Sequence, residues 1–271
     1  TRTVSGGGYN IPRALTTLDS HIDLLSLICL AVAGTIVRRA IASDGLADQF
    51  ILDAMHHTAQ SVNIYDQTGR RQIHTDLKDI QDRHYPTQLF NQALGRCSLA
   101  ALCNINYNRQ FLAQALNAAV PVATDVHTIA DDQDDYNQDF MAAAQILFMS
   151  DERLPCSPEQ FARRLQERYG TEVIVIGLGS EGALLAVRKD NFSERIAAVT
   201  TRPIVNTIGA GDALFSSFVH TYQQTGDPYL AIRKAIVFAS YKIGTSGAAE
   251  GFLTAAQLEE LYQSKKREGE I

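Results

Sequence analysis

The sequence has no pair of cysteines with the spacing of a metal or redox site. Its 4 cysteines stand at positions 29, 97, 103 and 156, and no two of them form a CxxC motif. Cys29 and Cys103 lie in apolar runs, where a thiol is usually a small buried hydrophobic group. The pattern predicts reduced thiols, which fit a cytoplasmic protein better than a secreted one.

Long apolar runs and an excess of positive charge are also absent. The longest apolar run, residues 24–33, is about half the ~20 residues that a membrane-spanning helix needs. The first residues show no secretion-signal pattern. With 24 basic against 30 acidic residues the formal net charge is -6, whereas a nucleic-acid-binding protein needs a basic face. We therefore expect neither a membrane nor a nucleic acid as partner.

The length and composition indicate an ordinary globular protein. The 271 residues are 45% hydrophobic and 20% charged, and a chain of this length buries roughly 75% of its extended surface when it folds. One α/β domain with a small appendage is the natural expectation. The chain opens on Thr1 rather than Met.

Strand-like apolar runs alternate with segments of helical periodicity. We expect strands at residues 24–33, 98–104, 120–125, 173–178 and 182–187, and helices at residues 35–55, 109–119, 157–169, 211–224 and 229–245. Residues 140–149 join a helix to a further short strand. This alternation predicts a mainly parallel sheet covered by helices on both faces, which binds ligands at the carboxyl ends of its strands.

Two short strand-like runs do not fit this alternation. Residues 61–66 and 72–77 flank a turn signal at positions 67–70, Gln-Thr-Gly-Arg. Two such runs around a glycine-containing turn predict a β-hairpin. We expect a small antiparallel flap beside the main domain.

The sharpest motif lies between a strand-like run at residues 202–205 and the expected helix at 211–224. It reads Asn206, Thr207, Ile208, Gly209, Ala210, Gly211 and Asp212. Small residues leave the backbone amides open, and amides at a helix N-terminus attract anions such as a phosphoryl group. Asp212 could accept a proton from an attacking hydroxyl. Alternatively, Asp212 only stabilises the first helical turn and the glycines only form a tight turn.

A second glycine-rich segment lies near the N-terminus. Gly6, Gly7, Gly8, Tyr9 and Asn10 precede an apolar-periodic stretch at residues 11–18. Glycine lets a ligand approach the backbone closely, and the Asn10 amide can both donate to and accept from sugar hydroxyls. The alternative is a loop with an Asn cap.

Together, in this order and about 200 residues apart, the two segments resemble the motifs of the ribokinase-like (PfkB) carbohydrate kinase family. That family carries a Gly-Gly…Asn segment near its N-terminus and an Asp-Thr-x-Gly-Ala-Gly-Asp segment near its C-terminus. Residues 173–185 resemble its nucleotide-contacting strand-turn-strand, and residues 235–248 resemble its adenine-covering helix and loop. The resemblance covers essentially the whole chain and implies a ribokinase-like three-layer α/β sandwich with a small β lid.

The resemblance implies ATP-dependent transfer of a phosphoryl group to a hydroxymethyl group of a small sugar or nucleoside. By this analogy Asp212 is the base, and the amides of Gly209, Ala210 and Gly211 form the anion hole. The acceptor-facing residues would be Gly6, Gly7 and Asn10, and the nucleotide-facing residues Thr207, Gly179, Gly182 and Gly247. The implied cofactors are ATP, a largely water-coordinated Mg²⁺ and a monovalent cation.

Several positions depart from the family pattern. Asn206 replaces the first Asp of the C-terminal signature. The Asn-x-x-Glu segment associated with Mg²⁺ is replaced near residues 150–153, where Glu152 or Asp151 could substitute at the wrong spacing. Gly177 and Ile236 replace a Thr and an Asn near the nucleotide. These changes keep open a catalytically silent relative that serves as a binding or regulatory module. Tyr9, which could stack on a base, keeps a nucleoside acceptor open.

Two further polar positions follow expected strands. Asp125 and Asn104 stand near the strands' carboxyl ends, the position where α/β sheets place ligands, so both are candidates for acceptor binding. Asp125 could instead cap its loop with His127 on the surface, and Asn104 could bridge to the lid. The exposed sheet edge of that lid invites pairing, which would give a homodimer.

The resemblance also divides the chain. Residues 1–8 and 60–78 would form the lid, and residues 9–59 and 79–271 the kinase core, with the nucleotide site in its C-terminal half. In the family a first core strand and part of the lid precede the glycine segment, and that strand carries an Asp that binds acceptor hydroxyls. Here only residues 1–4 precede Ser5. We therefore expect that a few tens of residues of the active site are missing in front.

Overall fold

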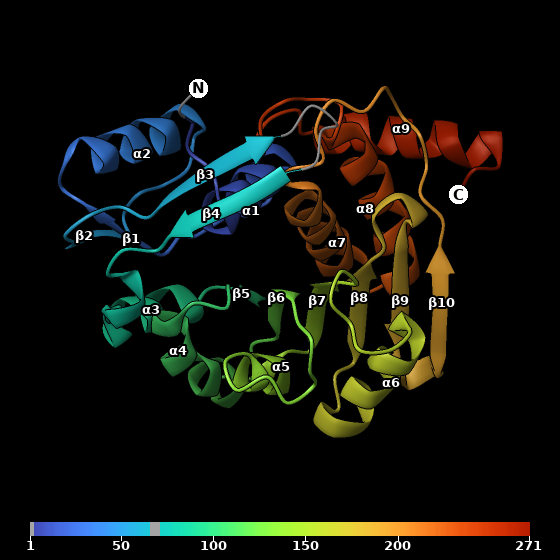
Figure 1. Cartoon of the computed structure of the whole chain (residues 1–271), viewed down its shortest axis with the longest axis horizontal. Coiled ribbons are helices and arrows are strands. Elements are labelled where there is room, and N and C mark those ends of the chain that lie inside the picture. Colours follow the sequence, from blue (N-terminus) through green and yellow to red (C-terminus); the bar gives the residue numbers. More distant parts are fainter. Residues whose placement is uncertain (1–2, 66–70) are drawn as a thin grey trace.

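A computed structural model describes residues 3–65 and 71–271. Its centre is a six-stranded sheet in the order β10-β9-β8-β7-β6-β5 (Figure 1). The strands are β5 (Ala100–Ala101), β6 (Val122–Thr128), β7 (Ile146–Ser150), β8 (Val173–Gly177), β9 (Ala183–Val187) and β10 (Phe192–Ile196). The pairs from β5 to β8 are parallel, whereas β9 is antiparallel to both β8 and β10. The expectation of a mainly parallel α/β sheet is confirmed.

Helices cover both faces of this sheet because its strand residues alternate between two cores. Ile174 and Ile176 of β8 join one hydrophobic cluster, and Val173 and Val175 join the other, as the period of two in a strand requires. The first face carries α3 (Thr87–Leu94), α4 (Asn106–Asn117), α5 (Gln138–Ala143) and α6 (Pro158–Tyr169). The second carries α1 (Gly7–Thr17), α7 (Ala210–Thr225), α8 (Pro228–Lys242) and α9 (Ala255–Glu268). These are the expected three layers.

Local sequence signals fix several helix starts. Ser157 caps α6 by accepting a hydrogen bond from the Gln160 amide, and Pro158 follows it in the first turn. Asp227 caps α8 in the same way, with Pro228 next. Such caps satisfy amides that have no partner inside the helix and stabilise it by about 1 kcal/mol. The helix expected at residues 157–169 is confirmed.

A second, smaller group of elements lies beside the sandwich. Its parts are β1 (Ser26–Cys29), α2 (Val32–Ser43) and β2 (Ile51–Met55), and β1 pairs with β2 in parallel. A third hydrophobic cluster joins Ile28, Ile41 and Ile51 to Tyr9 of α1. This cluster connects the small sheet to the helix that begins in the glycine segment.

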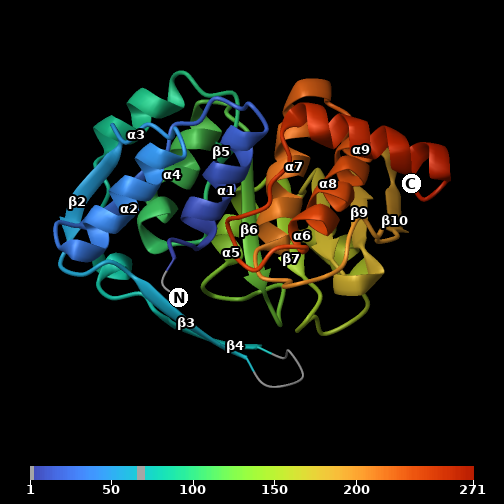
Figure 2. The same cartoon turned by 90° about the horizontal axis from the view of Figure 1, so that it is seen from above.

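The expected hairpin is present as β3 (Gln60–Tyr65) and β4 (Arg71–Asp76), which pair antiparallel. Figure 2 shows that it projects from the body of the molecule. Val62 and Ile64 are 60% and 54% exposed, and they share one face of the ribbon because they are two positions apart. The turn expected at positions 67–70 lies outside the described residues. A short 3-10 helix, Ile80–Asp82, follows the hairpin.

Two predicted elements near the N-terminus were wrong in extent. The strand expected at residues 24–33 is only β1, because α2 begins at Val32. The helix expected at residues 35–55 ends at Ser43, next to the predicted break at Asp44 and Gly45, and residues 51–55 form β2 instead. Parallel pairing with β1 is a tertiary contact that local periodicity does not reveal.

Other differences concern edges and connections. The strand expected at residues 98–104 is only β5, and the strand-like run at 202–205 is irregular backbone. The edge strand β10 and helix α3 were not predicted. Within residues 3–65 and 71–271 no helix has the length and apolarity to cross a membrane.

Candidate active site

Asp212 and Asn10 meet where α7 and α1 begin. Gly209 precedes α7 with a φ of 78°, and Asp212 lies in the first turn of that helix. Asn10 lies in α1 and is buried. Its Nδ2 donates a hydrogen bond of 2.7 Å to Asp212 Oδ2. The two predicted motifs therefore contact each other through these side chains.

Packing of α1 against α7 holds this pair in place. Ser216, one turn after Asp212, donates through its hydroxyl to the Asp212 carbonyl at 2.6 Å and reaches the Ile11 carbonyl at 3.5 Å. At the other end of α1, Ser20 Oγ lies 2.8 Å from His220 Nδ1. Ala14 and Leu15 of α1 belong to the same buried cluster as the apolar face of α7. The carboxylate is thus carried on a rigid pair of helices.

The environment of Asp212 makes its carboxylate more basic. Burial raises its pKa above the usual range, and the charge of Asp125 raises it further, while the Asn10 hydrogen bond and the charges of His127 and Lys242 act in the opposite direction. Burial disfavours the ionised form of an acid. A carboxylate with a raised pKa is a better proton acceptor near neutral pH.

Asn10 also offers an unused acceptor. Among the described residues, its Oδ1 is a buried atom without a hydrogen-bond partner. Buried polar atoms are seldom left in this state, because an unmade hydrogen bond costs about 1–3 kcal/mol. A hydroxyl group of a ligand bound beside Asp212 could donate to this oxygen.

The loop before α7 is fixed by hydrogen bonds to the end of α8. The amides of Val205 and Asn206 both donate to the Ile243 carbonyl, at 2.9 and 3.0 Å. The Asn206 side chain accepts from the Ile208 amide at 2.9 Å and donates to the Ser246 carbonyl at 3.2 Å. Asn206, which replaces the family's Asp, therefore retains a turn-forming role through its amide side chain.

Gly209 is required by geometry, whereas Gly211 is open. A β-carbon on Gly209 would lie 2.4 Å from the Ala248 carbonyl oxygen, and its φ is positive. Only glycine adopts such a position without strain. A β-carbon on Gly211 would meet nothing within 4 Å. The space beside Gly211, at the N-terminus of α7, is therefore free for a ligand.

Gly7 lies against the carboxylate. A β-carbon on Gly7 would be 3.5 Å from Asp212 Oδ1 and 3.9 Å from Cys103 Sγ. Burial, with the charges of Asp212 and Asp125, raises the pKa of the Cys103 thiol to about 12. Cys103 is therefore an uncharged thiol beside Asp212. The sequence analysis predicted a buried thiol but did not place it at the site. Gly6 precedes α1 with a φ of 105°, and its carbonyl accepts from the amides of Tyr9 and Asn10.

Asp125 stands on β6, close enough to Asp212 to influence it. Its side chain is only 15% exposed, and its Oδ1 accepts from the His127 amide at 2.8 Å. His127 Nδ1 lies 3.6 Å from Asp125 Oδ2, and His127 has a φ of 59°, an unusual value for a residue other than glycine. The loop-capping bond expected at Asp125 is therefore present, while a role of Asp125 in acceptor binding stays a prediction.

Asn104 is engaged with a neighbouring loop. Its Nδ2 donates to Asn137 Oδ1 at 2.9 Å, and its carbonyl accepts from the Tyr136 hydroxyl. Asn106, two residues on, donates through its side chain to the carbonyl of Gln81, which lies in the short helix after the hairpin. The bridge toward the hairpin is therefore made by Asn106.

The nucleotide candidates fall into different environments. Gly179 has a φ of 58° and open space beside it, whereas a β-carbon on Gly182 would lie 2.1 Å from the Ile196 carbonyl oxygen. A β-carbon on Gly247 would meet the Glu250 carboxylate within 3 Å. Thr207 is exposed in the loop before α7. Close packing and a φ of 102° are therefore sufficient to require glycine at position 182.

The metal candidate Glu152 is exposed just beyond the end of β7, where its amide donates to Ser150 Oγ at 3.3 Å. Among the described residues no three His, Cys, Asp or Glu side chains group in a way that could hold a metal ion. The exposed carboxylates of Asp151 and Glu152 are oxygen ligands of the kind that Mg²⁺ accepts when it keeps most of its water, and a metal role for Glu152 stays a prediction.

The sequence matches the pfkB family carbohydrate kinase over residues 1–255. The chain belongs to this family. PfkB-family carbohydrate kinases are phosphotransferases, and the match includes both motifs that meet at Asp212.

Individual relatives of this pfkB-family chain differ in how much they share with it. A deoxyribokinase of Salmonella typhi is 32% identical over 99 residues, so that the match spans 36% of this chain and 31% of that protein. An acarbose 7(IV)-phosphotransferase of an Actinoplanes species is 24% identical over 257 residues, 93% of this chain and 84% of that protein. The structure of a microbiome-derived acarbose kinase has a TM-score of 0.84 at 25% identity, over 96% of this chain and 86% of that one.

One charged residue near the candidate site of this pfkB-family chain was missed by sequence reasoning. Lys242, the last residue of α8, is fully buried, and its Nζ donates to the Ile208 carbonyl. The same helix also carries Arg233 and Lys234, so the sequence does not single out Lys242, and only the tertiary packing shows where its side chain goes.

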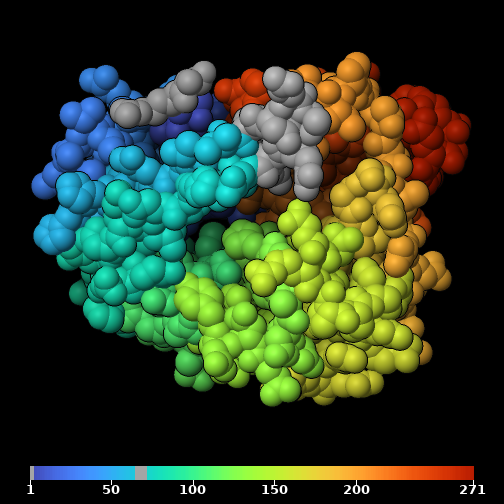
Figure 3. Space-filling model, in the orientation of Figure 1, coloured from blue at the N-terminus to red at the C-terminus, as the bar shows by residue number. Residues whose placement is uncertain are grey.

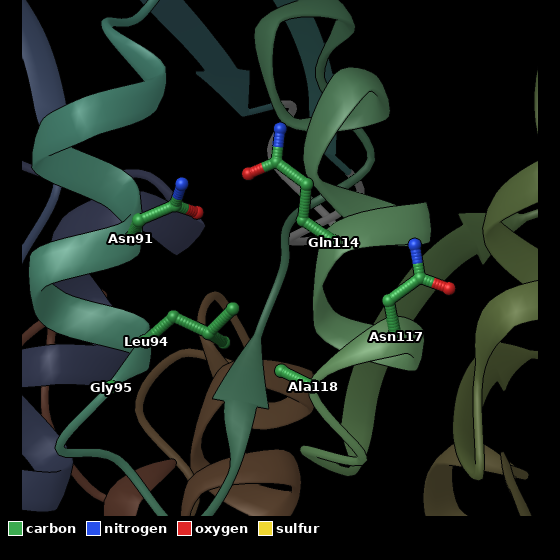
Figure 4. A pocket seen from close by; sticks show the side chains of 6 residues that line it. All are labelled: Asn91, Leu94, Gly95, Gln114, Asn117 and Ala118. Atoms are coloured by element: carbon green, nitrogen blue, oxygen red, sulfur yellow. The ribbon is translucent and has the colours of Figure 1, made fainter.

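Two hollows are visible at the surface. Figure 3 shows one between the hairpin and the green segments of the chain. Figure 4 shows a pocket between α3 and α4, where Asn91 and Leu94 face Gln114 and Ala118. None of the predicted site residues lines the pocket of Figure 4, so we do not connect it with the chemistry at Asp212.

Proposed function

We propose that this protein is an ATP-dependent kinase that transfers the γ-phosphoryl group to a hydroxymethyl group of a small sugar. The observation that supports it best is the Asp212 carboxylate, held by Asn10 and made basic by burial, in the first turn of α7. The open backbone at Gly211 adds a place for an anion beside that carboxylate.

In the proposed reaction the acceptor hydroxyl gives its proton to Asp212 Oδ1 while its oxygen attacks the γ-phosphorus of ATP. The bond from that phosphorus to the bridging oxygen breaks, and ADP leaves. The amides of Gly209, Ala210 and Gly211 would bind the negative charge on the transferred group, aided by the dipole of α7. Asn10 would keep Oδ2 occupied, so that Oδ1 receives the proton.

The acceptor would lie on Gly6, Gly7 and Asn10, with Asp125 and Asn104 at the strand ends. Asn10 Oδ1, buried and unpartnered among the described residues, would accept from a second acceptor hydroxyl. Gly7 keeps the approach to Asp212 Oδ1 clear, since a side chain there would lie within contact distance of it. A small number of precisely placed polar contacts can orient a small ligand.

A sugar is favoured over a nucleoside by the position of Tyr9. Its ring is buried in the cluster that includes Ile28 and Ile41, and its hydroxyl donates to Asp44. Burial raises the pKa of that hydroxyl to about 12, so it stays protonated and keeps donating. Tyr9 therefore serves the packing of α1 and does not offer a face for stacking on a base.

ATP would extend from the N-terminus of α7 along Thr207 and Gly247 toward Gly179 and Gly182. Mg²⁺ would arrive with its phosphates and neutralise part of their charge, with Glu152 as the candidate protein ligand. The hairpin, which borders the hollow of Figure 3, would act as the lid that excludes water from the transfer. Pairing of two copies through the hairpin edge stays a prediction.

The Asp212→Asn variant tests the assignment of the base. General-base contributions are commonly 10²–10⁴-fold, so ADP formation with 2-deoxyribose or acarbose as acceptor should fall by roughly 10³-fold. The matched control is Asp48→Asn, which makes the same chemical change at an exposed residue paired with Arg38 and should keep full activity. Unchanged turnover in Asp212→Asn would refute the base.

A thermal-unfolding panel of sugars and nucleosides separates the alternatives. A ligand at 100 times its Kd stabilises the folded state by about 2.7 kcal/mol. We expect stabilisation by a sugar and by ATP with Mg²⁺, but not by inosine or adenosine. If calorimetry detects no ATP binding, the protein is the catalytically silent relative that Asn206, Gly177 and the altered 150–153 segment keep open.

A further inference from the structure

A fully buried lysine lies at the base of the loop that precedes α7. Lys242 is 0% exposed, although lysine is almost never fully buried unless it is paired. Removing an ammonium group from water costs several kcal/mol. The buried Lys242 side chain must make interactions that offset this desolvation free energy. Those interactions indicate its role.

The Lys242 ammonium is directed at the backbone of the glycine loop. Its Nζ donates to the Ile208 carbonyl, and Ile208 immediately precedes Gly209, whose left-handed φ starts α7. Lys242 is also the last residue of α8, where the helix dipole favours a positive charge. One cation therefore joins the C-terminus of α8 to the loop that leads into the N-terminus of α7.

The backbone around Lys242 is fixed on both sides. Its own carbonyl accepts from the Thr245 amide at 3.2 Å and from the Thr245 hydroxyl at 2.9 Å. The loop at residues 205–208 is bonded to Ile243 and Ser246, as described above. The ammonium therefore lies between two loops that cannot easily move away from it.

The positive charge of Lys242 also affects the pKa of Asp212, the proposed base. Lys242 acts to lower the pKa of Asp212, as does His127, against the opposing effects of burial and of Asp125. Lys242 acts on Asp212 from α8, and Asp125 and His127 act on it from β6. The Cys103 thiol also interacts with Asp212. The position of Lys242 thus connects the loop geometry to the electrostatics of the site.

We infer that Lys242 is a positioning residue, an internal cation that fixes the Ile208 carbonyl and thereby aims the Gly209–Gly211 amides at the transferred phosphoryl group. This rests on the proposed kinase function. It has a consequence for cofactors, because a cation built into the loop removes the need for a dissolved monovalent cation to organise it. The kinase should work equally well with or without K⁺.

The first test removes the charge and keeps the volume. In Lys242→Met, kcat should fall by roughly 10²-fold, the loss seen when one donor of an oxyanion hole is removed, while KM for the acceptor stays near its original value. Because Lys242 lowers the pKa of Asp212, the acid limb of the rate profile should move to higher pH. The matched control is Lys234→Met, in the same helix but paired with Glu259, which should change neither quantity.

The second test supplies a cation from solution. Lys242→Ala leaves space beside the Ile208 carbonyl, and backbone carbonyl oxygens are good ligands for K⁺. At constant ionic strength of about 0.1 M, replacing tetramethylammonium by K⁺ or NH₄⁺ should raise kcat of Lys242→Ala roughly tenfold and leave the wild type unchanged. Equal stimulation of the wild type, or no loss of kcat in Lys242→Met, would overturn the inference.

A readout independent of activity keeps this inference separate from the proposed function. Amide hydrogen exchange of the segment 205–214 should be faster in Lys242→Met than in the wild type, and K⁺ should slow it again in Lys242→Ala. If the wild type phosphorylates nothing, the proposed function fails while the exchange comparison still decides the role of Lys242. If neither variant folds, Lys242 serves the stability of the whole domain and the inference is wrong.

Discussion

Asn10 and Asp212 stand 202 positions apart in the chain, and a hydrogen bond of 2.7 Å joins their side chains. The amide of Asn10 favours the charged form of the carboxylate, while burial opposes that form. The basicity of Asp212 is therefore set by two contributions of opposite sign, and each can be changed separately.

Replacing Asn10 by Ala should move the pH dependence of activity upward. The hydrogen bond lowers the pKa of Asp212, so its loss raises that pKa, and the carboxylate becomes available as a base only at higher pH. We expect the acid limb of the kcat/KM profile to move to higher pH. KM for the acceptor should also rise.

Asn91→Ala provides the control, because Asn91 is exposed on α3 and lines the pocket away from Asp212. Its pH profile should match that of the wild type. An acid limb that stays in place in Asn10→Ala would mean that the hydrogen bond does not tune the base.

Replacing Asp212 by Asn should make the protein more stable at neutral pH. A carboxyl whose pKa is raised on folding favours the unfolded state at pH values above its ordinary pKa, because the folded state must bury a charge. Asn removes that charge. The Tm of Asp212→Asn should therefore exceed the wild-type Tm at pH 7, and the difference should vanish as the pH approaches about 4.

Differential scanning calorimetry at several pH values measures this difference. A variant that is less stable than the wild type at pH 7 would show that the ionised Asp212 contributes favourably to folding, contrary to the direction of its pKa shift.

A methyl group on Gly7 should impair catalysis without impairing folding. In Gly7→Ala the new β-carbon would lie 3.5 Å from Asp212 Oδ1, an ordinary contact distance that blocks the approach of an acceptor hydroxyl. Because Ala is a better helix former than Gly by about 1 kcal/mol, the Tm should be kept or raised. Steady-state kinetics should give a higher KM for the acceptor.

Gly8→Ala is the matched control for this variant. It makes the same substitution one position on in α1, where a β-carbon would meet nothing within 4 Å. Activity should be unchanged. Equal kinetics in both variants would place the acceptor away from Gly7.

Much of the C-terminal half follows from local signals in the sequence. The helix over residues 158–169 is marked by Ser157 and Pro158, and the apolar runs that become β8 and β9 read directly as buried strands. The motif that ends in Asp212 also predicted the start of α7, since glycine and a first-turn carboxylate are typical of helix N-termini.

The rest depends on contacts between distant residues. β2 is a strand because it pairs with β1, and its five residues are too few for periodicity to distinguish strand from helix. Lys242 looks like a surface lysine in the sequence, yet it is buried beneath the glycine loop. Neither outcome is encoded in the neighbouring residues, so neither could be inferred without the fold.

The pairing of α1 with α7 also determines the order in which the site can form during synthesis. Asn10 leaves the ribosome before its partner Asp212, which follows 202 residues later. At about 5–20 residues per second, the first motif waits roughly 10–40 seconds for the second. Nascent chains that stop before α7 therefore lack the site altogether.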